Sequence, residues 1–323
     1  MPGPPAPGGQ RSALVAAGAD GGGTPVNGSG RDGGLDAVRL VVVTPARNES
    51  EHLPHTIASM RAQRLVPLRW VIVDDGSTDG TGERARELGG DIPWMEVVTR
   101  HDRGERRPGG GVVEAFYAGY ERVAHLDWTH LVKLDADLEF GPDYFAVIVG
   151  RMLADRDLGI AGGMIENLVD GRRVLEQHPR FHVRGATKVY TRACWEAIGG
   201  LHAVKGWDTL DELQAARRGF RTVSFDDVRL VQRRFTGDGT GQWINWNKNG
   251  EAAYVCGYHP AYLVAKAVRR AFVRPWLVAS VGLLVGYARA ALRRRPRVDD
   301  AELRAFVREQ QWRRLTGRSS LWR

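Results

Sequence analysis

Three clusters of acidic and polar residues each follow an apolar run in the first half of this 323-residue chain. They occupy Thr44–Glu49, Asp74–Ser77 and Asp135–Asp137. Any one of them alone is ordinary turn chemistry. Carboxylates brought to one site, however, can hold a hard divalent cation against a phosphate group. The question is therefore whether the surrounding elements bring the three clusters together.

Buried strands are predicted directly before the three clusters, at Val38–Val43, Trp70–Val73 and Thr129–Leu134, because these runs are apolar and rich in β-branched residues. Helices are expected between the first strands, from about Asn48 to Gln63 and from Asp79 to Leu88. This alternation predicts a parallel sheet with right-handed crossovers. The carboxyl ends of such strands meet at one edge, where ligands bind.

Alternating strands and helices are also predicted in the rest of the chain. We predict further strands at 95–98, 158–165, 222–224 and 229–231, and helices after Gly111, from Pro142 to Ala154, from Thr191 to Gly199 and from Asp208 to Gly219. The predicted organisation is a tail at 1–37, an α/β domain at 38–257 and a helical extension at 258–323.

The three blocks Val43–Glu49, Trp70–Thr81 and Leu134–Asp137, in this order, resemble the family 2 glycosyltransferases. The resemblance covers residues 38–235, well over half of the chain. It implies an α/β fold, a single Rossmann-like glycosyltransferase A domain with a mainly parallel sheet. The domain at 38–257 would then be catalytic, with 38–137 as its nucleotide-binding half and 138–257 as its acceptor half. It also implies inverting transfer of a sugar from a nucleoside-diphosphate donor, UDP- or GDP-linked, to a hydroxyl acceptor, with Mn²⁺ or Mg²⁺ as cofactor.

The resemblance also implies roles for individual residues. Asp137 corresponds to a direct metal ligand, and Asp135 to a residue near the donor ribose or bound to the metal through water. Gly109 lies in a Gly-rich loop whose backbone N–H groups would approach the diphosphate at a helix N-terminus. The implied nucleotide-sugar pocket consists of Thr44, Pro45, Ala46, Arg47, Glu49, Asp74, Asp75, Gly76, Ser77, Gly109 and Asp135.

Inverting transfer needs a base that accepts the proton of the acceptor hydroxyl. Counted back from Gly219–Phe220, Asp208 takes the position of the family's catalytic aspartate, although Trp207 replaces its usual acidic neighbour. Asp211 lies three residues further on the same helical face and is the second candidate. The structural alternative is that Asp208 caps the helix and Asp211 interacts with its dipole.

Other sequence features exclude some kinds of enzyme that share this fold. The family's late histidine is replaced by Val231–Arg234, and Gln242–Trp246 lacks the arginine of processive synthases, so a polymerising synthase is not expected. A sugar-nucleotidyltransferase would carry a Gly-rich signature and a lysine after the first strand, unlike Thr44–Arg47. The remaining rival, a membrane-associated binding protein with an inactive transferase domain, is disfavoured because the acidic residues are intact.

The amino-acid composition indicates the cellular compartment and the kind of partner to expect. Residues 1–37 are rich in Gly, Pro and Ala, which predicts a disordered tail. Two cysteines are too few for a disulfide scaffold, which favours the cytoplasm. The net charge of +8 is concentrated near the C-terminus, and no nucleic-acid-binding motif accompanies it. These basic residues are Lys266, Arg269, Arg270, Arg274, Arg289, Arg293, Arg294, Arg295 and Arg297.

The stretch Pro275–Ala288 contains fourteen residues without a charge. A membrane-spanning helix needs about 20. Basic clusters lie on both sides of the stretch, which favours helices that lie on the inner face of the cell membrane. The acceptor would then be lipid-linked or part of a cell-envelope glycan. The alternative is that the helices of 258–292 pack on the catalytic domain.

Overall fold

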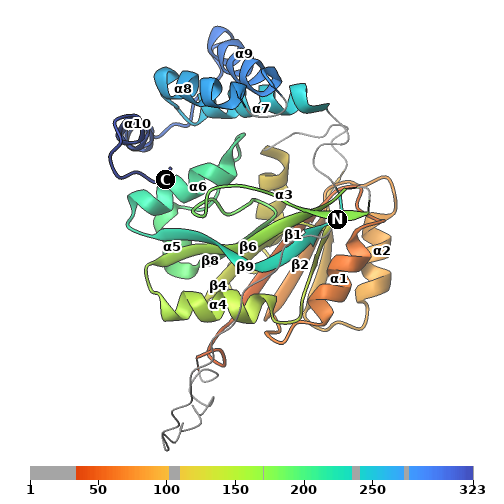
Figure 1. The fold of residues 1–323 in the computed structure, drawn as a ribbon. Coiled ribbons are helices and arrows are strands. Elements are labelled where there is room, and N and C mark those ends of the chain that lie inside the picture. Colours follow the sequence, from red (N-terminus) through yellow and green to blue (C-terminus); the bar gives the residue numbers. More distant parts are fainter. Residues whose placement is uncertain (1–33, 102–109, 170, 235–240, 273–275, 323) are drawn as a thin grey trace, which may run out of the picture.

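The computed structural model describes residues 34–101, 110–169, 171–234, 241–272 and 276–322 (Figure 1). Most of the predicted tail, 1–33, and Gly109 lie outside these ranges. The described chain forms one sheet with strand order β3-β2-β1-β4-β8-β6-β9-β5, and β7 pairs with β6. Helices cover both faces of this sheet, which gives the expected three-layer α/β fold.

Strands β1–β4 form the parallel half of the sheet. They are β1 (Leu40–Ala46), β2 (Arg69–Asp74), β3 (Met95–Thr99) and β4 (His130–Leu134). The other half is mixed, because β8 runs antiparallel to both β4 and β6, while β9 runs parallel to β6. It contains β5 (Leu138–Phe140), β6 (Leu158–Val169), β7 (Arg172–Leu175), β8 (Thr187–Thr191) and β9 (Arg221–Gln232).

Alternate residues of β1 pack into two different cores. Val42 belongs to the core that also contains α1 (Leu53–Arg61), α2 (Thr81–Gly89) and α4 (Tyr144–Ala154). Val43 belongs to the core on the opposite face, which contains α3 (Gly110–Tyr120), α5 (Arg192–Ile198) and α6 (Trp207–Arg217). Because β1 is buried on both faces, it reads as a continuous apolar run in the sequence.

The structure confirms the strands predicted before the three acidic clusters. It also confirms the helix that Thr191 caps, since the Thr191 hydroxyl accepts a hydrogen bond from the Cys194 backbone N–H at 3.2 Å. The two strands predicted at 222–224 and 229–231 are wrong as separate elements, because both belong to β9. Its register jumps from Phe225 to Arg229 opposite Gly163 and Met164 of β6, so a bulge rather than a turn separates them. Strands β5, β7 and β8 were not predicted.

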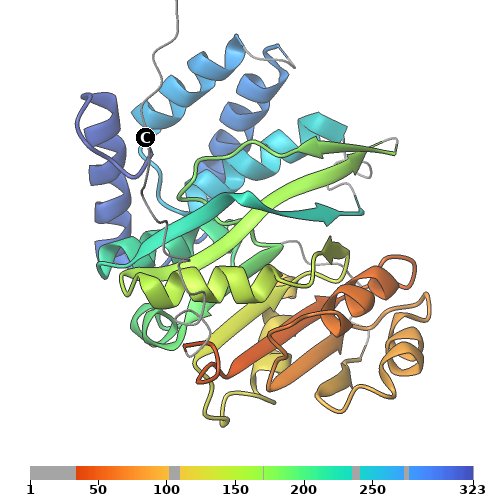
Figure 2. The ribbon, with the colours of Figure 1, turned by 60° about the horizontal axis from the view of Figure 1, so that its bottom comes forward.

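Four helices follow the sheet, namely α7 (Gly241–Val255), α8 (Pro260–Ala271), α9 (Val278–Leu292) and α10 (Ala301–Leu315). Figures 1 and 2 show α7, α8 and α9 grouped together beyond α6. Helices α7 and α9 approach so closely that a Cβ on Gly286 would lie 2.0 Å from the Asn247 carbonyl oxygen. Within the described residues, no helix is long and apolar enough to cross a membrane.

The C-terminal helices share a core with the catalytic domain. Leu210 and Leu213 of α6 belong to the same buried cluster as Leu263, Leu283 and Leu303 of α8, α9 and α10. The inner faces of the extension therefore pack on the protein, as the alternative reading of its sequence expects. A truncation near Gly257 would expose this shared core, so point substitutions are the sounder way to examine the outer faces.

Candidate functional site

The carboxyl ends of β1, β2 and β4 bring the three acidic clusters to one edge of the sheet. Ala46 is the register partner of Asp74, and the backbone N–H of Asp75 donates to the Ala46 carbonyl at 2.8 Å. Val43 is in turn the register partner of Lys133, two residues before Asp135. The sequence prediction that the clusters share one edge is confirmed by this register.

The first two clusters are locked together by hydrogen bonds between their loops. Asn48 adopts a positive φ of 56°, and its backbone N–H donates to the Ser77 hydroxyl at 3.0 Å. Its side-chain oxygen accepts from the Thr78 backbone at 2.9 Å. The guanidinium of Arg47 donates to the Asp75 carbonyl at 2.6 Å. These contacts fix the shape of the predicted nucleotide pocket before any ligand binds.

The remaining predicted pocket residues lie in different surroundings. The Thr44 side chain is fully buried and accepts from the Trp70 indole N–H at 2.9 Å, so its hydroxyl serves the core. Pro45 and Ala46 are buried within β1, and Gly76 forms a left-handed turn at φ 70°. The Asp74 carboxylate accepts from the Ser77 backbone at 2.9 Å, and Asp75 pairs with Arg100 at 2.7 Å. Arg100 was not singled out from the sequence.

Asp135 and Asp137 follow β4 and act on each other electrostatically. Asp137 is buried, and its carboxylate accepts from the Gln232 side-chain amide at 3.0 Å. Burial, together with the neighbouring Asp135 charge, raises the pKa of Asp137 to about 6. The Asp135 carboxylate contacts the ammonium of Lys133. A buried lysine beside the Asp-x-Asp motif is a signal that the sequence offered, because lysine is rarely placed in a core strand without a partner.

The end of β9 adds positive charge to the same edge. The Arg233 backbone N–H donates to the Asp137 carbonyl at 2.9 Å, and its guanidinium pairs with Glu139 at 2.6 Å. Arg234 forms an ion pair with Glu49 in the first cluster. From the sequence, this segment is distinguished only by the absence of the family's histidine. The structure shows instead that this segment ties the first and third clusters together.

The two candidate bases on α6 differ in exposure. The side chain of Asp208 is 24% exposed and lies 3.8 Å from the Arg184 guanidinium. The side chain of Asp211 is 1% exposed, and both of its oxygens accept from the Lys188 ammonium, at 2.8 and 2.9 Å. The Tyr190 hydroxyl donates to the same carboxylate at 2.5 Å. Asp211 is therefore fully engaged in the interior, whereas Asp208 reaches the surface.

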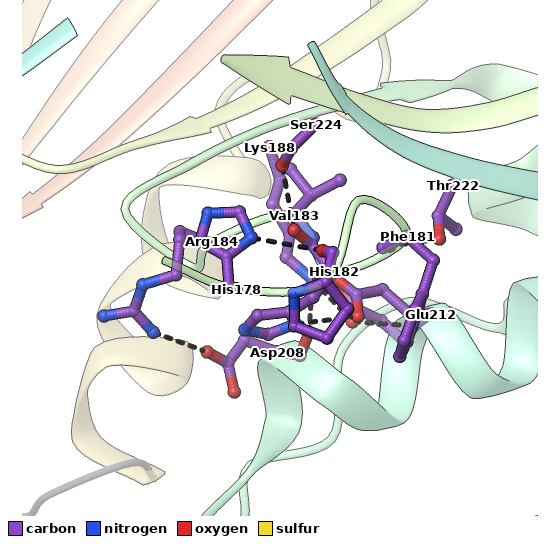
Figure 3. A network of polar contacts seen from close by, with 12 residues as sticks. His178, Phe181, His182, Val183, Arg184, Lys188, Asp208, Glu212, Thr222 and Ser224 are labelled. Atoms are coloured by element: carbon purple, nitrogen blue, oxygen red, sulfur yellow. Dashed lines mark hydrogen bonds and ion pairs between the residues drawn. The ribbon is translucent and has the colours of Figure 1, made fainter. Parts of the chain in front are cut away.

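Lys188 is the centre of a buried ionic network that joins α6 to β8 (Figure 3). Its ammonium also contacts the Asp208 carbonyl at 2.5 Å and the Glu212 carboxylate at 3.0 Å. Glu212 in turn accepts from the Val183 backbone at 2.6 Å and pairs with the His182 ring at 2.9 Å. The network thus fixes the first turn of α6 against both β8 and the segment before it.

Charges in this network shift the pKa values of its members. Burial raises the pKa of Asp211 to about 7. Burial acts in the same direction on Asp208, but the cations His182, Lys188 and Arg184 outweigh it and hold the pKa of Asp208 below its ordinary value. Asp208 is therefore a carboxylate at neutral pH, as a base must be.

Asp208 is also connected to the strand edge. A Cβ on Gly185 would lie 3.1 Å from the Asp208 Cβ, so this backbone passes directly beside Asp208. The Gly185 carbonyl accepts from Lys133 at 2.5 Å, and Lys133 contacts Asp135. The structure thus brings Asp208 to the Asp-x-Asp edge. The sequence could not show this, because the connection runs through a glycine carbonyl and a buried lysine.

The fold and this arrangement define a glycosyltransferase A domain with its acidic residues at one edge of the sheet. The sequence profile described as "Glycosyl transferase family 2" matches residues 41–202, just over half of the chain. The chain belongs to this family.

Two curated relatives and one solved structure illustrate the similarity. The polyprenol monophosphomannose synthase of Mycolicibacterium smegmatis is 31% identical over 146 residues, which are 43% of this chain and 52% of the relative. The 4,4'-diaponeurosporenoate glycosyltransferase of Staphylococcus aureus is 32% identical over 101 residues, 31% of this chain and 24% of the relative. The matches thus span about half and a quarter of the relatives' own lengths.

A solved mannosyltransferase from Pyrobaculum calidifontis, in complex with GDP-Man and Mn²⁺, superimposes with a TM-score of 0.51 at 18% identity. The superposition covers 87% of this chain and 76% of that one. At this identity the likeness shows the shared fold.

Proposed function

We propose that this protein is an inverting glycosyltransferase that moves a sugar from a nucleoside-diphosphate donor to a hydroxyl acceptor. The observation that carries the proposal is the convergence of Asp135, Asp137 and Asp208. The two carboxylates at the strand edge are connected, through Lys133 and the Gly185 backbone, to a third, ionised carboxylate on a helix that a buried network holds in place. Family membership supports the same reaction class.

Asp137 and Asp135 suit a divalent cation, Mn²⁺ or Mg²⁺. Their oxygens are hard ligands, and a bound cation would offset both the burial and the Asp135 charge that raise the pKa of Asp137. Within the described ranges, no group of three or more His, Cys, Asp or Glu side chains is placed to hold a metal. A site of two carboxylates, completed by donor phosphates and water, is the usual pattern for Mg²⁺. When bound, the cation neutralises charge on the departing diphosphate.

Asp208 is proposed as the base. The acceptor oxygen forms a bond to the anomeric carbon, its proton passes to the Asp208 carboxylate, and the bond to the diphosphate breaks with its electron pair on the departing nucleoside diphosphate. Asp211 is too buried to reach an acceptor, and we assign it a structural role instead. Arg234 and Arg233 add positive charge at the donor end.

The acceptor is proposed to be lipid-linked and presented at the inner face of the cell membrane. Both curated relatives are named for lipid-like substrates, a polyprenol and a diaponeurosporenoate. One relative and the solved neighbour are named for mannose, so GDP-mannose is the first donor to examine, with UDP-sugars as the alternative.

A donor screen tests the proposal. Melting temperature should be measured with GDP-mannose, GDP, UDP-glucose and UDP, each with Mn²⁺, with Mg²⁺ and with a chelator. One nucleotide series should raise the melting temperature by a few degrees at saturating ligand, only with metal. The same donor should then support transfer to a polyprenyl phosphate. If no nucleotide sugar binds or reacts in the presence of metal, the chain is a binding protein with an inactive transferase domain.

A further inference from the structure

The end of α8 and the start of α9 carry a cluster of large exposed apolar side chains. Phe272 is 74% exposed, Trp276 58% and Leu277 62%. Single exposed apolar residues are common on soluble proteins, but several together indicate an interaction surface. We call these three residues the hairpin tip, because the Ser280 hydroxyl donates to the Ala267 carbonyl at 2.7 Å and so holds the start of α9 against α8.

An exposed apolar stripe runs along each helix to the hairpin tip. On α8, Val264 and Val268 are exposed at a spacing of four residues, with Phe272 four residues further. On α9, the exposed side chains are Val278, Val281 and Leu284. The opposite faces of both helices are buried in the C-terminal core. The exposed stripes are therefore apolar surface that packing within the described part of the chain leaves uncovered.

The positive charge of the C-terminal helices indicates what kind of partner the apolar stripes would bind. Residues 258–298 contain nine Lys and Arg and no Asp or Glu, and 258–323 have a net charge of +11, whereas 1–257 have −3. Lys266 and Arg269 are also exposed on α8. An apolar surface bordered by cations suits a bilayer with anionic headgroups. A second copy of this chain fits less well, because two surfaces of the same positive charge repel each other.

We propose that the hairpin tip inserts into the interfacial region of an anionic membrane. At 15 residues, α9 is shorter than the roughly 20 residues that a spanning helix needs, so the apolar stripes would lie in the plane of the headgroups. This surface is separate from the acidic strand edge and would bring the protein to a lipid-linked acceptor. Binding of this surface to lipid requires neither donor nor metal. A failure of lipid binding would therefore leave the proposed sugar transfer standing, and a failure of transfer would leave lipid binding standing.

Co-sedimentation of the full chain with lipid vesicles tests this proposal. Vesicles of phosphatidylcholine and phosphatidylglycerol should bind the protein, vesicles of phosphatidylcholine alone should bind it weakly, and added salt should release it. Trp276→Glu and Phe272→Glu should each lower the partition coefficient at least about tenfold, because each side chain stabilises the inserted state by burying apolar surface. Lys266→Gln with Arg269→Gln should make the salt dependence shallower.

Matched controls separate insertion from general effects. Val66→Glu and Val174→Glu introduce the same charge at apolar positions of similar exposure, 54% and 51%, far from the C-terminal helices in sequence, and should bind vesicles like the original protein. All variants should keep the melting temperature and the transfer rate on a water-soluble acceptor. The proposal is overturned if the full chain ignores anionic vesicles at low salt, or if the controls lose binding as the tip variants do. It is also overturned if light scattering shows a dimer that Trp276→Glu dissociates.

Discussion

The strand edge and the α6 network both contain buried or half-buried carboxylates, but these carboxylates have different partners. At the strand edge, burial and then the neighbouring Asp135 charge raise the pKa of Asp137 to about 6, and its carboxylate accepts from the Gln232 side-chain amide. In the α6 network, the carboxylates of Asp211 and Glu212 share the ammonium of Lys188. We propose that a bound cation completes the first site, whereas a lysine of the chain itself already pairs with the carboxylates of the second. The difference between the two regions is therefore the partner of the carboxylate, a neutral amide for Asp137 and an ammonium for Asp211.

The largest expected effect is on the strand edge. Asp137→Asn should lower the transfer rate by about a thousandfold, because charge stabilisation by a bound metal is worth several kcal/mol in the transition state. The melting temperature without metal should stay the same or rise slightly, since the substitution removes repulsion. Asp91→Asn, at an exposed ion pair with Arg61, is the matched control and should retain activity. Near-normal transfer by the Asp137 variant would remove this residue from the metal site.

In the α6 network, by contrast, substitution should lower the stability of the fold. Lys188→Met leaves Asp211 and Glu212 buried without their cation, which should cost about 3–5 kcal/mol in the free energy of unfolding. Arg84→Met, which removes the exposed pair with Glu87, should change it little. Urea unfolding of both variants makes the comparison. Equal free energies of unfolding for the two variants would show that the ion pairs of Lys188 do not stabilise the fold.

Asp211→Asn tests the same distinction with a smaller change. The asparagine keeps a hydrogen-bonding side chain but weakens the contacts with Lys188 and Tyr190, so the free energy of unfolding should fall by about 1–3 kcal/mol. Transfer per folded molecule should stay within about tenfold of normal, because this carboxylate reaches no acceptor. Complete loss of transfer in a stably folded variant would instead make Asp211 the base.

The smallest effect is a pH dependence from His182. Burial acts to lower the pKa of its imidazole, but the Glu212 carboxylate outweighs it and the pKa is raised above 6.5. The folded state therefore holds this proton more tightly than the unfolded state. The resulting stability is fully present below pH 6.5 and is lost as the pH rises through the folded pKa. The melting temperature of the original protein should thus fall more steeply with rising pH than that of His182→Gln. Parallel curves would contradict the raised pKa.

The strand edge could be predicted from the sequence because its signals are local. Leu40–Val43 and Trp70–Val73 are buried on both faces, and each acidic cluster follows its strand directly. The parallel register then places the clusters together without further information. Asp135 and Asp137 could be predicted as a pair of metal ligands because both lie in one three-residue motif at the end of a strand.

The α6 network could not be predicted in the same way. Lys188 lies in the short strand β8, and its partner Asp211 is 23 residues further along the chain, so nothing near Lys188 indicates that it is buried. Asp226 and Asp227 lie between the two strands predicted at 222–224 and 229–231, but their side chains pair with Arg180 and Arg151 while β9 continues. Long-range ion pairs of this kind leave no pattern in a single sequence.

Asp208 lies between the two regions, and the measurement that tests the account most directly is made there. Asp208→Asn should bind the donor with metal as tightly as the original protein, by calorimetry, because the strand edge is untouched. Its single-turnover transfer to a hydroxyl acceptor should fall at least about a hundredfold, since the proton of that hydroxyl loses its base. Normal transfer by Asp208→Asn, in a folded protein that still binds donor, would contradict the assignment of this carboxylate and with it the proposed division between donor edge and acceptor helix.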